Sequence, residues 1–138
     1  MSASDSQIPH PDVPGIAVGC GVMTVSDTRS PDTDRSGQLI QQLLQSNGHR
    51  VVTYGVIPDE PTQIQSQLVQ LSQLPDLEAL IFNGGTGIAP RDTTYDALEG
   101  LLEKTLPGFG EIFRWLSYQE IGSRAIASRA IAGVYQSK

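Results

Sequence analysis

The sequence predicts an α/β fold built on a mostly parallel sheet. Short apolar segments of strand length alternate with segments whose apolar residues recur at helical spacing, in the order strand, helix, strand, helix, strand, helix. This order favours parallel strands joined by right-handed crossovers. At 138 residues, and with no internal repeat or linker after the first 15, the chain is expected to form about one domain.

The first strand and helix follow a lead of 15 residues. The Ser, Pro and Asp content of this lead predicts disorder, and it lacks the basic-then-apolar order of a signal peptide. Residues 16–25 (IAVGCGVMTV) are almost continuously apolar, which is typical of a strand buried on both faces. Ser36 is a candidate N-cap for the next helix, and Gly48 is its C-terminal stop. The apolar stripe of that helix consists of Leu39, Ile40, Leu43 and Leu44.

The later elements continue the alternation. Strands are predicted over residues 51–57 and 77–82, and between them Pro61 occupies the first position of a helix. The stripe of this second helix is Ile64, Leu68, Leu71 and Leu74. Further helices are predicted from residue 93 to about 103 and from 107 to about 119, and residues 131–135 indicate a last strand. Residues 121–130 give no clear pattern, and residues 16–138 are expected to form a single α/β domain.

Composition argues against several classes of function. A net charge of −6 disfavours a general nucleic-acid binder, which needs a basic face. Cys20 is the only cysteine, and no apolar run approaches the roughly 20 residues that span a bilayer. We therefore expect a cytoplasmic protein without nucleic-acid or membrane partners. Residues 112–138 carry four basic residues against one acidic residue, which is either a solvated face or a patch that receives an anion.

Polar residues follow all three predicted strands. Ser26 and Asp27 come after the first strand, Asp59 after the second, and the glycine-rich segment 83–87 (NGGTG) after the third. Because the carboxyl ends of parallel strands share one edge of a sheet, these residues are expected to converge on one cleft. Asp59 could instead cap the second helix.

The glycine-rich segment matches neither of the familiar phosphate-binding templates. A Walker loop needs a lysine, which is absent from residues 84–92, and a dinucleotide fingerprint counted from Gly85 would need glycine where this chain has Pro90. It is therefore either a structural turn or a loop whose backbone N–H groups approach an anion. An aspartate beside such a loop, Asp92, becomes useful when Mg²⁺ lies between carboxylate and phosphate. Arg91 would then neutralise charge on the substrate, or form an exposed ion pair.

Taken together, GGTG at 84–87 and RD-x-T at 91–94 resemble the MoaB/Mog family of molybdenum cofactor biosynthesis proteins. The resemblance covers roughly residue 15 to the end, and residues 113–133 are more similar to the MoaB branch. The other segments that match in order are Ser26-Asp27, Ser36-Gly37, Pro58-Asp59-Glu60, the PGFGE of 107–111 and Ser128-Arg129.

This resemblance implies a three-layer α/β/α sandwich, a Rossmann-like domain that forms trimers or hexamers, binds molybdopterin and works with other proteins of the pathway. It implies transfer of AMP from ATP to the terminal phosphate of molybdopterin, with Mg²⁺ present and pyrophosphate released. Asp59 and Asp92 would hold the Mg²⁺, and Arg91 would stabilise developing charge. The pterin-phosphate site would consist of Gly84, Gly85, Thr86 and Gly87, with Ser26 and Asp27 alongside.

The chain departs from the family pattern in two places. Tyr95 stands where the family usually has proline. The family pattern also continues beyond Lys138 through another strand, a Pro-Gly-Ser loop that helps to line the pterin site, and a last helix. The chain is therefore expected to lack these elements and to leave residues 131–135 without a hairpin partner.

Three functions remain open at this point. The first is a molybdopterin adenylyltransferase, which retention of both aspartates favours. The second is a MoaB-type protein that binds molybdopterin without efficient transfer, which the MoaB-like C-terminal half favours. The third is a nucleotide phosphohydrolase similar to domains of competence-damage proteins.

Overall fold

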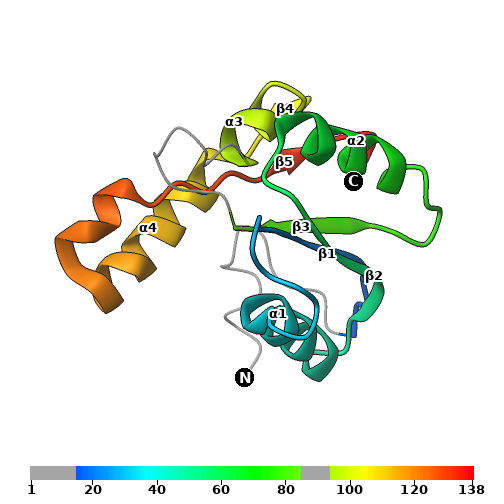
Figure 1. The fold of residues 1–138 in the computed structure, drawn as a ribbon, viewed down its shortest axis with the longest axis horizontal. Coiled ribbons are helices and arrows are strands. Elements are labelled where there is room, and N and C mark those ends of the chain that lie inside the picture. Colours follow the sequence, from blue (N-terminus) through cyan, green and yellow to red (C-terminus); the bar gives the residue numbers. More distant parts are fainter. Residues whose placement is uncertain (1–14, 85–93) are drawn as a thin grey trace, which may run out of the picture.

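The computed structural model describes residues 15–84 and 94–138 (Figure 1). A parallel sheet with the strand order β2-β1-β3 lies at its centre, formed by β1 (Gly19–Val25), β2 (Arg50–Ile57) and β3 (Ala79–Asn83). The helix α1 (Arg35–Ser46) covers one face, and α2 (Pro61–Leu71) and α3 (Thr94–Glu99) cover the other (Figure 1). The predicted three-layer fold with a parallel sheet is confirmed.

The middle strand, β1, is buried along its whole length. It has a strand on each side and helices over each face, which is why its sequence is almost continuously apolar. The prediction of a strand buried on both faces is confirmed, although the strand begins at Gly19 rather than at residue 16.

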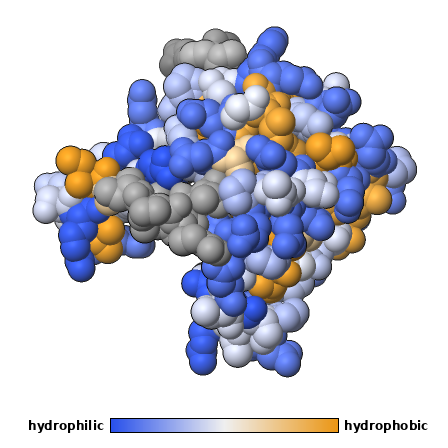
Figure 2. Space-filling view, turned by 45° about the horizontal axis from the view of Figure 1, so that its top comes forward, coloured by the Kyte–Doolittle hydropathy of each residue, from blue (hydrophilic) through white to orange (hydrophobic). Residues whose placement is uncertain are grey.

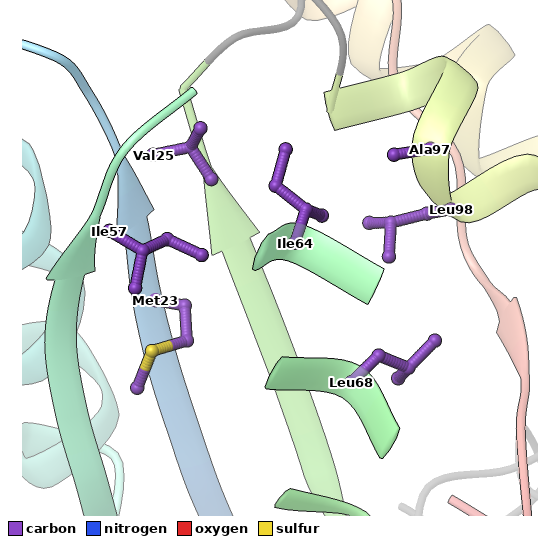
Figure 3. Close-up of a cluster of buried hydrophobic side chains, with 7 residues drawn as sticks. All are labelled: Met23, Val25, Ile57, Ile64, Leu68, Ala97 and Leu98. Carbon is purple, nitrogen blue, oxygen red and sulfur yellow. The ribbon is translucent and has the colours of Figure 1, made fainter. Parts of the chain in front are cut away.

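The main apolar core lies between the sheet and the helices α2 and α3 (Figure 3). The sheet contributes Met23 and Val25 from β1 and Ile57 from β2. The helices contribute Ile64 and Leu68 from α2 and Ala97 and Leu98 from α3. Ile64 is fully buried, and burying a side chain of this size stabilises the fold by about 1.5–3 kcal/mol.

The helix starts differ from two sequence-based predictions. Asp34, not Ser36, caps α1, and its carboxylate accepts a hydrogen bond from the N–H of Gly37. The N-cap of α2 is Glu60, so Asp59 does not have the capping role that the sequence left open. Pro61 at the first position of α2 is confirmed, and Gly48 follows α1 with a positive φ of 85°, which suits a helix stop.

The C-terminal part of the chain holds more structure than its pattern indicates. The helix predicted to reach about residue 103 is shorter, since α3 stops at Glu99, and a short strand β4 (Lys104–Thr105) follows it. After α4 (Pro107–Ile121) comes the 3₁₀ helix η2 (Gly122–Ala127), in the segment without a clear pattern. The strand β5 (Gly133–Val134) pairs antiparallel with β4, a pairing that the sequence pattern did not predict, and the expected lack of a following hairpin strand stays a prediction. In the part of the chain that the structure describes, no helix is long and apolar enough to cross a membrane.

Candidate functional site

The carboxyl ends of the three parallel strands lie level with one another. Val25 of β1 is paired with Ile57 of β2, and Thr24 of β1 is paired with Asn83 of β3. The residues that follow each strand, Ser26, Pro58 and Gly84, therefore leave the sheet along one edge. The three strand ends share one edge, as parallel topology predicts, whereas the convergence of the site residues on one cleft stays a prediction.

Asp27 and Asp59 are joined directly at this edge. A carboxylate oxygen of Asp27 accepts a hydrogen bond of 3.0 Å from the backbone N–H of Asp59, 32 residues away in sequence. The N–H of Ser26 donates to the carbonyl of Ile57 at 2.9 Å, so the two strand ends are tied twice. Asp59 is buried, with 8% of its surface exposed. A buried acidic side chain at the end of a parallel strand is consistent with a binding role, since it does not cap α2.

Ser26 organises the loop that leaves β1. Its hydroxyl oxygen accepts hydrogen bonds from the N–H groups of Thr28 and Arg29, at 3.2 and 3.1 Å. The loop bends there. Together with residues at the end of β2, it borders an open hollow of about 360 Å³. The hollow is lined by Ser26, Asp27, Arg29, Ser30, Pro31, Val56, Ile57 and Pro58. Two of the predicted substrate-binding residues, Ser26 and Asp27, thus share one concave surface.

Gly84 begins the glycine-rich segment directly above the end of β1. Its φ is +101°, and a Cβ atom added there would lie 2.4 Å from the carbonyl oxygen of Val25. Only glycine fits this close approach. Because Val25 directly precedes Ser26 and Asp27, the segment starts close to these two residues. The other predicted residues of this segment lie outside the described residues: Gly85, Thr86, Gly87, Arg91 and Asp92.

Replacing Gly84 with alanine is expected to destabilise the fold by about 2–3 kcal/mol, because it adds a backbone collision to an unfavourable φ. Urea unfolding followed by circular dichroism measures this loss. Gly100→Ala is the matched control, since a Cβ at Gly100 meets nothing within 4 Å and its φ is not positive. Equal midpoints for Gly84→Ala and the wild type would contradict the close approach.

Sequence reasoning missed a buried polar cluster behind this edge. Asp34 is completely buried, and its carboxylate accepts a hydrogen bond of 2.6 Å from the hydroxyl of Tyr54. Arg29, whose side chain lines the hollow, lies 3.7 Å from the same carboxylate. Burial raises the pKa of Asp34, but hydrogen bonds that include those from Tyr54 and Gly37, together with Arg29, outweigh it and lower the pKa. The cluster therefore holds a carboxylate charge beneath the loop that carries Ser26 and Arg29.

The spacing Asp34-x-x-Gly37 is a signal that could have identified this cluster, because a helix cap accepts from the N–H three residues on. A Cβ at Gly37 would lie 2.1 Å from the Asp34 carboxylate and 2.6 Å from the Thr24 hydroxyl. Glycine at this position lets α1 start against the carboxylate. Tyr54 has its pKa raised to about 12, first by burial and then by its hydrogen bond to Asp34 and the charge of Asp34.

The fit of a magnesium ion can be tested on the described carboxylates. No group of three or more His, Cys, Asp or Glu side chains within residues 15–84 and 94–138 could hold a metal ion unaided. Mg²⁺, however, usually binds one or two carboxylates and takes its other ligands from phosphates and water. Asp59 fits that mode as a single carboxylate at the strand ends, whereas Asp92, its predicted partner, lies outside the described residues.

The basic C-terminal segment is used mainly for contacts within the chain. Arg114 and Arg124 donate to the carbonyls of Ser128 and Ile121, and Lys138 donates to the carbonyls of Leu74 and Leu77. These contacts favour a structural role for the basic residues over the binding of an anion.

Arg129 contacts two residues at the start of α3. Its guanidinium group bonds Asp96 at 3.0 Å and lies 4.7 Å from the ring centre of Tyr95, a cation–π contact. Tyr95, which departs from the family pattern, therefore has a defined partner.

A separate apolar cavity of about 480 Å³ runs along β3 towards α3 and α4. Asn83 and Thr94 line it on either side of segment 85–93. The side-chain nitrogen of Asn83 and the hydroxyl of Thr94 are buried and, in the described part of the chain, lack hydrogen-bond partners. Each could gain a bond from a polar ligand at this end of the cavity.

The sequence is similar to those of known proteins. Residues 21–137 match the family described as "Probable molybdopterin binding domain". The chain is 55% identical over 122 residues to the molybdenum cofactor biosynthesis protein B of Halalkalibacterium halodurans, covering 88% of this chain and 72% of that protein. It is 47% identical over 137 residues to the protein of the same name from Bacillus subtilis, covering 99% and 78%.

The fold is also similar to that of a solved structure. The crystal structure of a molybdenum cofactor biosynthesis protein B aligns with a TM-score of 0.84 at 45% sequence identity. The alignment covers 87% of this chain and 75% of that one.

Proposed function

This chain belongs to the molybdopterin-binding family of molybdenum cofactor biosynthesis proteins, within its MoaB group, and on that premise we propose that it adenylylates molybdopterin. In the proposed reaction, an oxygen of the terminal phosphate of molybdopterin attacks the α-phosphorus of ATP. A new phosphoanhydride bond forms, the bond between the α- and β-phosphates breaks, and pyrophosphate leaves.

The observation that carries the proposal is the meeting of three strand ends at one edge. The Asp27–Asp59 hydrogen bond joins the first two ends, and Gly84 passes over the carbonyl of Val25 at the third. In parallel α/β sheets this edge is where ligands bind. Transfer of an adenylyl group depends mainly on positioning and charge neutralisation, both of which such an edge can supply.

Each residue has a proposed role. Ser26 and Asp27 help to position the pterin phosphate, and Gly84 opens the loop that surrounds it. In the segment outside the described residues, Gly85, Thr86 and Gly87 offer backbone N–H groups to that phosphate. Arg91 stabilises the charge that develops on the phosphates, and Asp59 and Asp92 hold the metal.

Asp59 and Asp92 would hold the Mg²⁺, which would supply charge neutralisation for the ATP phosphates. We assign metal binding to the two aspartates rather than proton removal, because carboxylate oxygens are the ligands that Mg²⁺ prefers in proteins. The proposal includes a cytoplasmic location, other proteins of the cofactor pathway as partners, and a trimer or hexamer of this chain.

The proposal predicts that the full chain, mixed with molybdopterin, ATP and Mg²⁺, releases pyrophosphate in proportion to adenylylated pterin. Omitting molybdopterin or chelating the metal should stop the release. A coupled pyrophosphate assay with product identification by mass spectrometry measures both quantities. Nucleotide hydrolysis without pterin would support the phosphohydrolase instead and would contradict the proposal.

A binding protein of the same pathway is the second candidate. It is favoured by the names of the similar proteins, which specify cofactor biosynthesis but no transferase activity. Under this alternative, molybdopterin binds with no pyrophosphate release at any ATP concentration. Calorimetric titration with molybdopterin, followed by addition of ATP, separates binding from transfer.

A further inference from the structure

Arg29 lies on the loop that leaves β1 and lines the hollow that this loop borders. Among the described residues that line the hollow, Arg29 is the one basic side chain and Asp27 is the one acidic side chain. A phosphate group placed beside Asp27 would be repelled unless a positive charge also faced it. The composition of the hollow therefore makes Arg29 the candidate for that charge.

Exposure alone does not mark an arginine as a binding residue. Figure 2 shows hydrophilic residues over much of the surface, and exposed ion pairs usually have little effect on a protein. The side chain of Arg29 is 42% exposed and pairs with Asp34 at 3.7 Å. This pair differs from an ordinary surface ion pair because the side chain of Asp34 is completely buried.

Asp34 does not depend on Arg29 for its hydrogen bonds. The N–H of Gly37 donates to one carboxylate oxygen at 3.0 Å, and the hydroxyl of Tyr54 donates to the other at 2.6 Å. At 3.7 Å, Nη1 of Arg29 lies beyond hydrogen-bond distance of the carboxylate. Within residues 15–84 and 94–138 the guanidinium group donates no hydrogen bond, so its five N–H groups are available to a ligand.

The loop holds Arg29 in place without a ligand. On one side, the hydroxyl oxygen of Ser26 accepts a hydrogen bond of 3.1 Å from the backbone N–H of Arg29. On the other side, the side-chain amide of Gln38 on α1 donates to the carbonyl of Pro31 at 2.8 Å. A residue that is already ordered loses less conformational freedom when a ligand binds. The loop is therefore prepared for binding.

We propose that Arg29 binds the terminal phosphate of molybdopterin in the hollow that it shares with Ser26 and Asp27. The planar guanidinium group of an arginine can donate two parallel, charge-assisted hydrogen bonds to two phosphate oxygens. The buried charge of Asp34 keeps this group beside the hollow. The inference rests on the proposed function, which assigns the pterin phosphate to Ser26 and Asp27.

Arg29→Ala should weaken the binding of molybdopterin about 10–100-fold, the usual effect of losing hydrogen bonds to a charged group. Anaerobic calorimetric titration of the full chain without ATP measures this change in the dissociation constant. A separate titration with ATP should give the wild-type affinity. The melting temperature should change little, because Asp34 keeps its hydrogen bonds with Gly37 and Tyr54.

Arg50→Ala is the matched control variant. Arg50 begins β2, at the opposite end of the sheet, and lies 3.7 Å from Glu78. The substitution therefore removes the same charge and an ion pair of the same length, and it should leave the affinity for molybdopterin unchanged. Molybdopterin from which a phosphatase has removed the phosphate is the control ligand. It should bind equally well to the wild type and to Arg29→Ala.

Several results would overturn the proposal: equal affinities of the wild type and Arg29→Ala for intact molybdopterin, an equal loss in Arg50→Ala, a loss that persists with the dephosphorylated pterin, or a loss of affinity for ATP alone. A wild type that does not bind molybdopterin would overturn it as well. Binding that depends on Arg29 without any release of pyrophosphate would contradict the proposed adenylylation and support the role of Arg29. The two proposals can therefore fail separately.

Discussion

Asp59→Asn is expected to lower the rate of molybdopterin adenylylation by about 10²–10³-fold, the usual effect of removing one electrostatic contact from a transition state. The substitution removes the charge at the end of β2 and keeps the size of the side chain. It also keeps the backbone N–H that donates to Asp27, so the joined strand ends should survive. Pyrophosphate release at saturating ATP and molybdopterin measures the loss, and the melting temperature checks the fold.

Asp76→Asn provides the matched control for charge. Asp76 precedes β3, and its carbonyl lies beside Gly19, the first residue of β1, so it is at the opposite end of the sheet. The same change in net charge there should leave the rate unaltered. A wild-type rate for Asp59→Asn would remove Asp59 from the mechanism. Equal losses in both variants would instead indicate a general effect of charge.

Much of the fold could be predicted because its elements have strong local patterns. The continuous apolar run of β1 and the stripe containing Ile64 and Leu68 give burial and periodicity directly, and the three strand ends follow from parallel topology. The two-residue strands β4 and β5 could not be predicted in this way. They are too short to have a pattern, and their pairing depends on contacts between residues about 30 apart.

The site could be predicted only as far as topology determines it. Convergence of Ser26, Asp27 and Asp59 follows from parallel strands, but the hydrogen bond from Asp59 to Asp27 depends on loop conformations that no sequence period encodes. Asp34 was missed for a similar reason. Ser36, two residues later, satisfies the same capping preference, and the contacts of Asp34 with Tyr54 and Arg29 arise only in the folded chain.

Asp34→Ala is expected to reduce the free energy of unfolding by about 3 kcal/mol at neutral pH. It removes the cap of α1, worth about 1 kcal/mol, and leaves the partly buried Tyr54 hydroxyl without its acceptor, which costs about 1–3 kcal/mol more. Denaturant unfolding at pH 7 measures the loss. Tyr54→Phe is the comparison variant and should cost about 1.5–3 kcal/mol, because it removes one hydrogen bond to a buried charged group and keeps the cap.

The stability of the wild type and that of Asp34→Ala should also depend differently on pH. The pKa of Asp34 in the folded chain is below its ordinary value of 3.8, so its carboxylate contributes its full stability above about pH 5. As the pH falls below 4 and through the lower folded pKa, protonation removes that contribution. The stability difference between wild type and Asp34→Ala should therefore be constant from pH 5 to 7 and shrink below pH 4. A difference that stays constant down to pH 2 would show that Asp34 stabilises the fold through shape alone, without its charge.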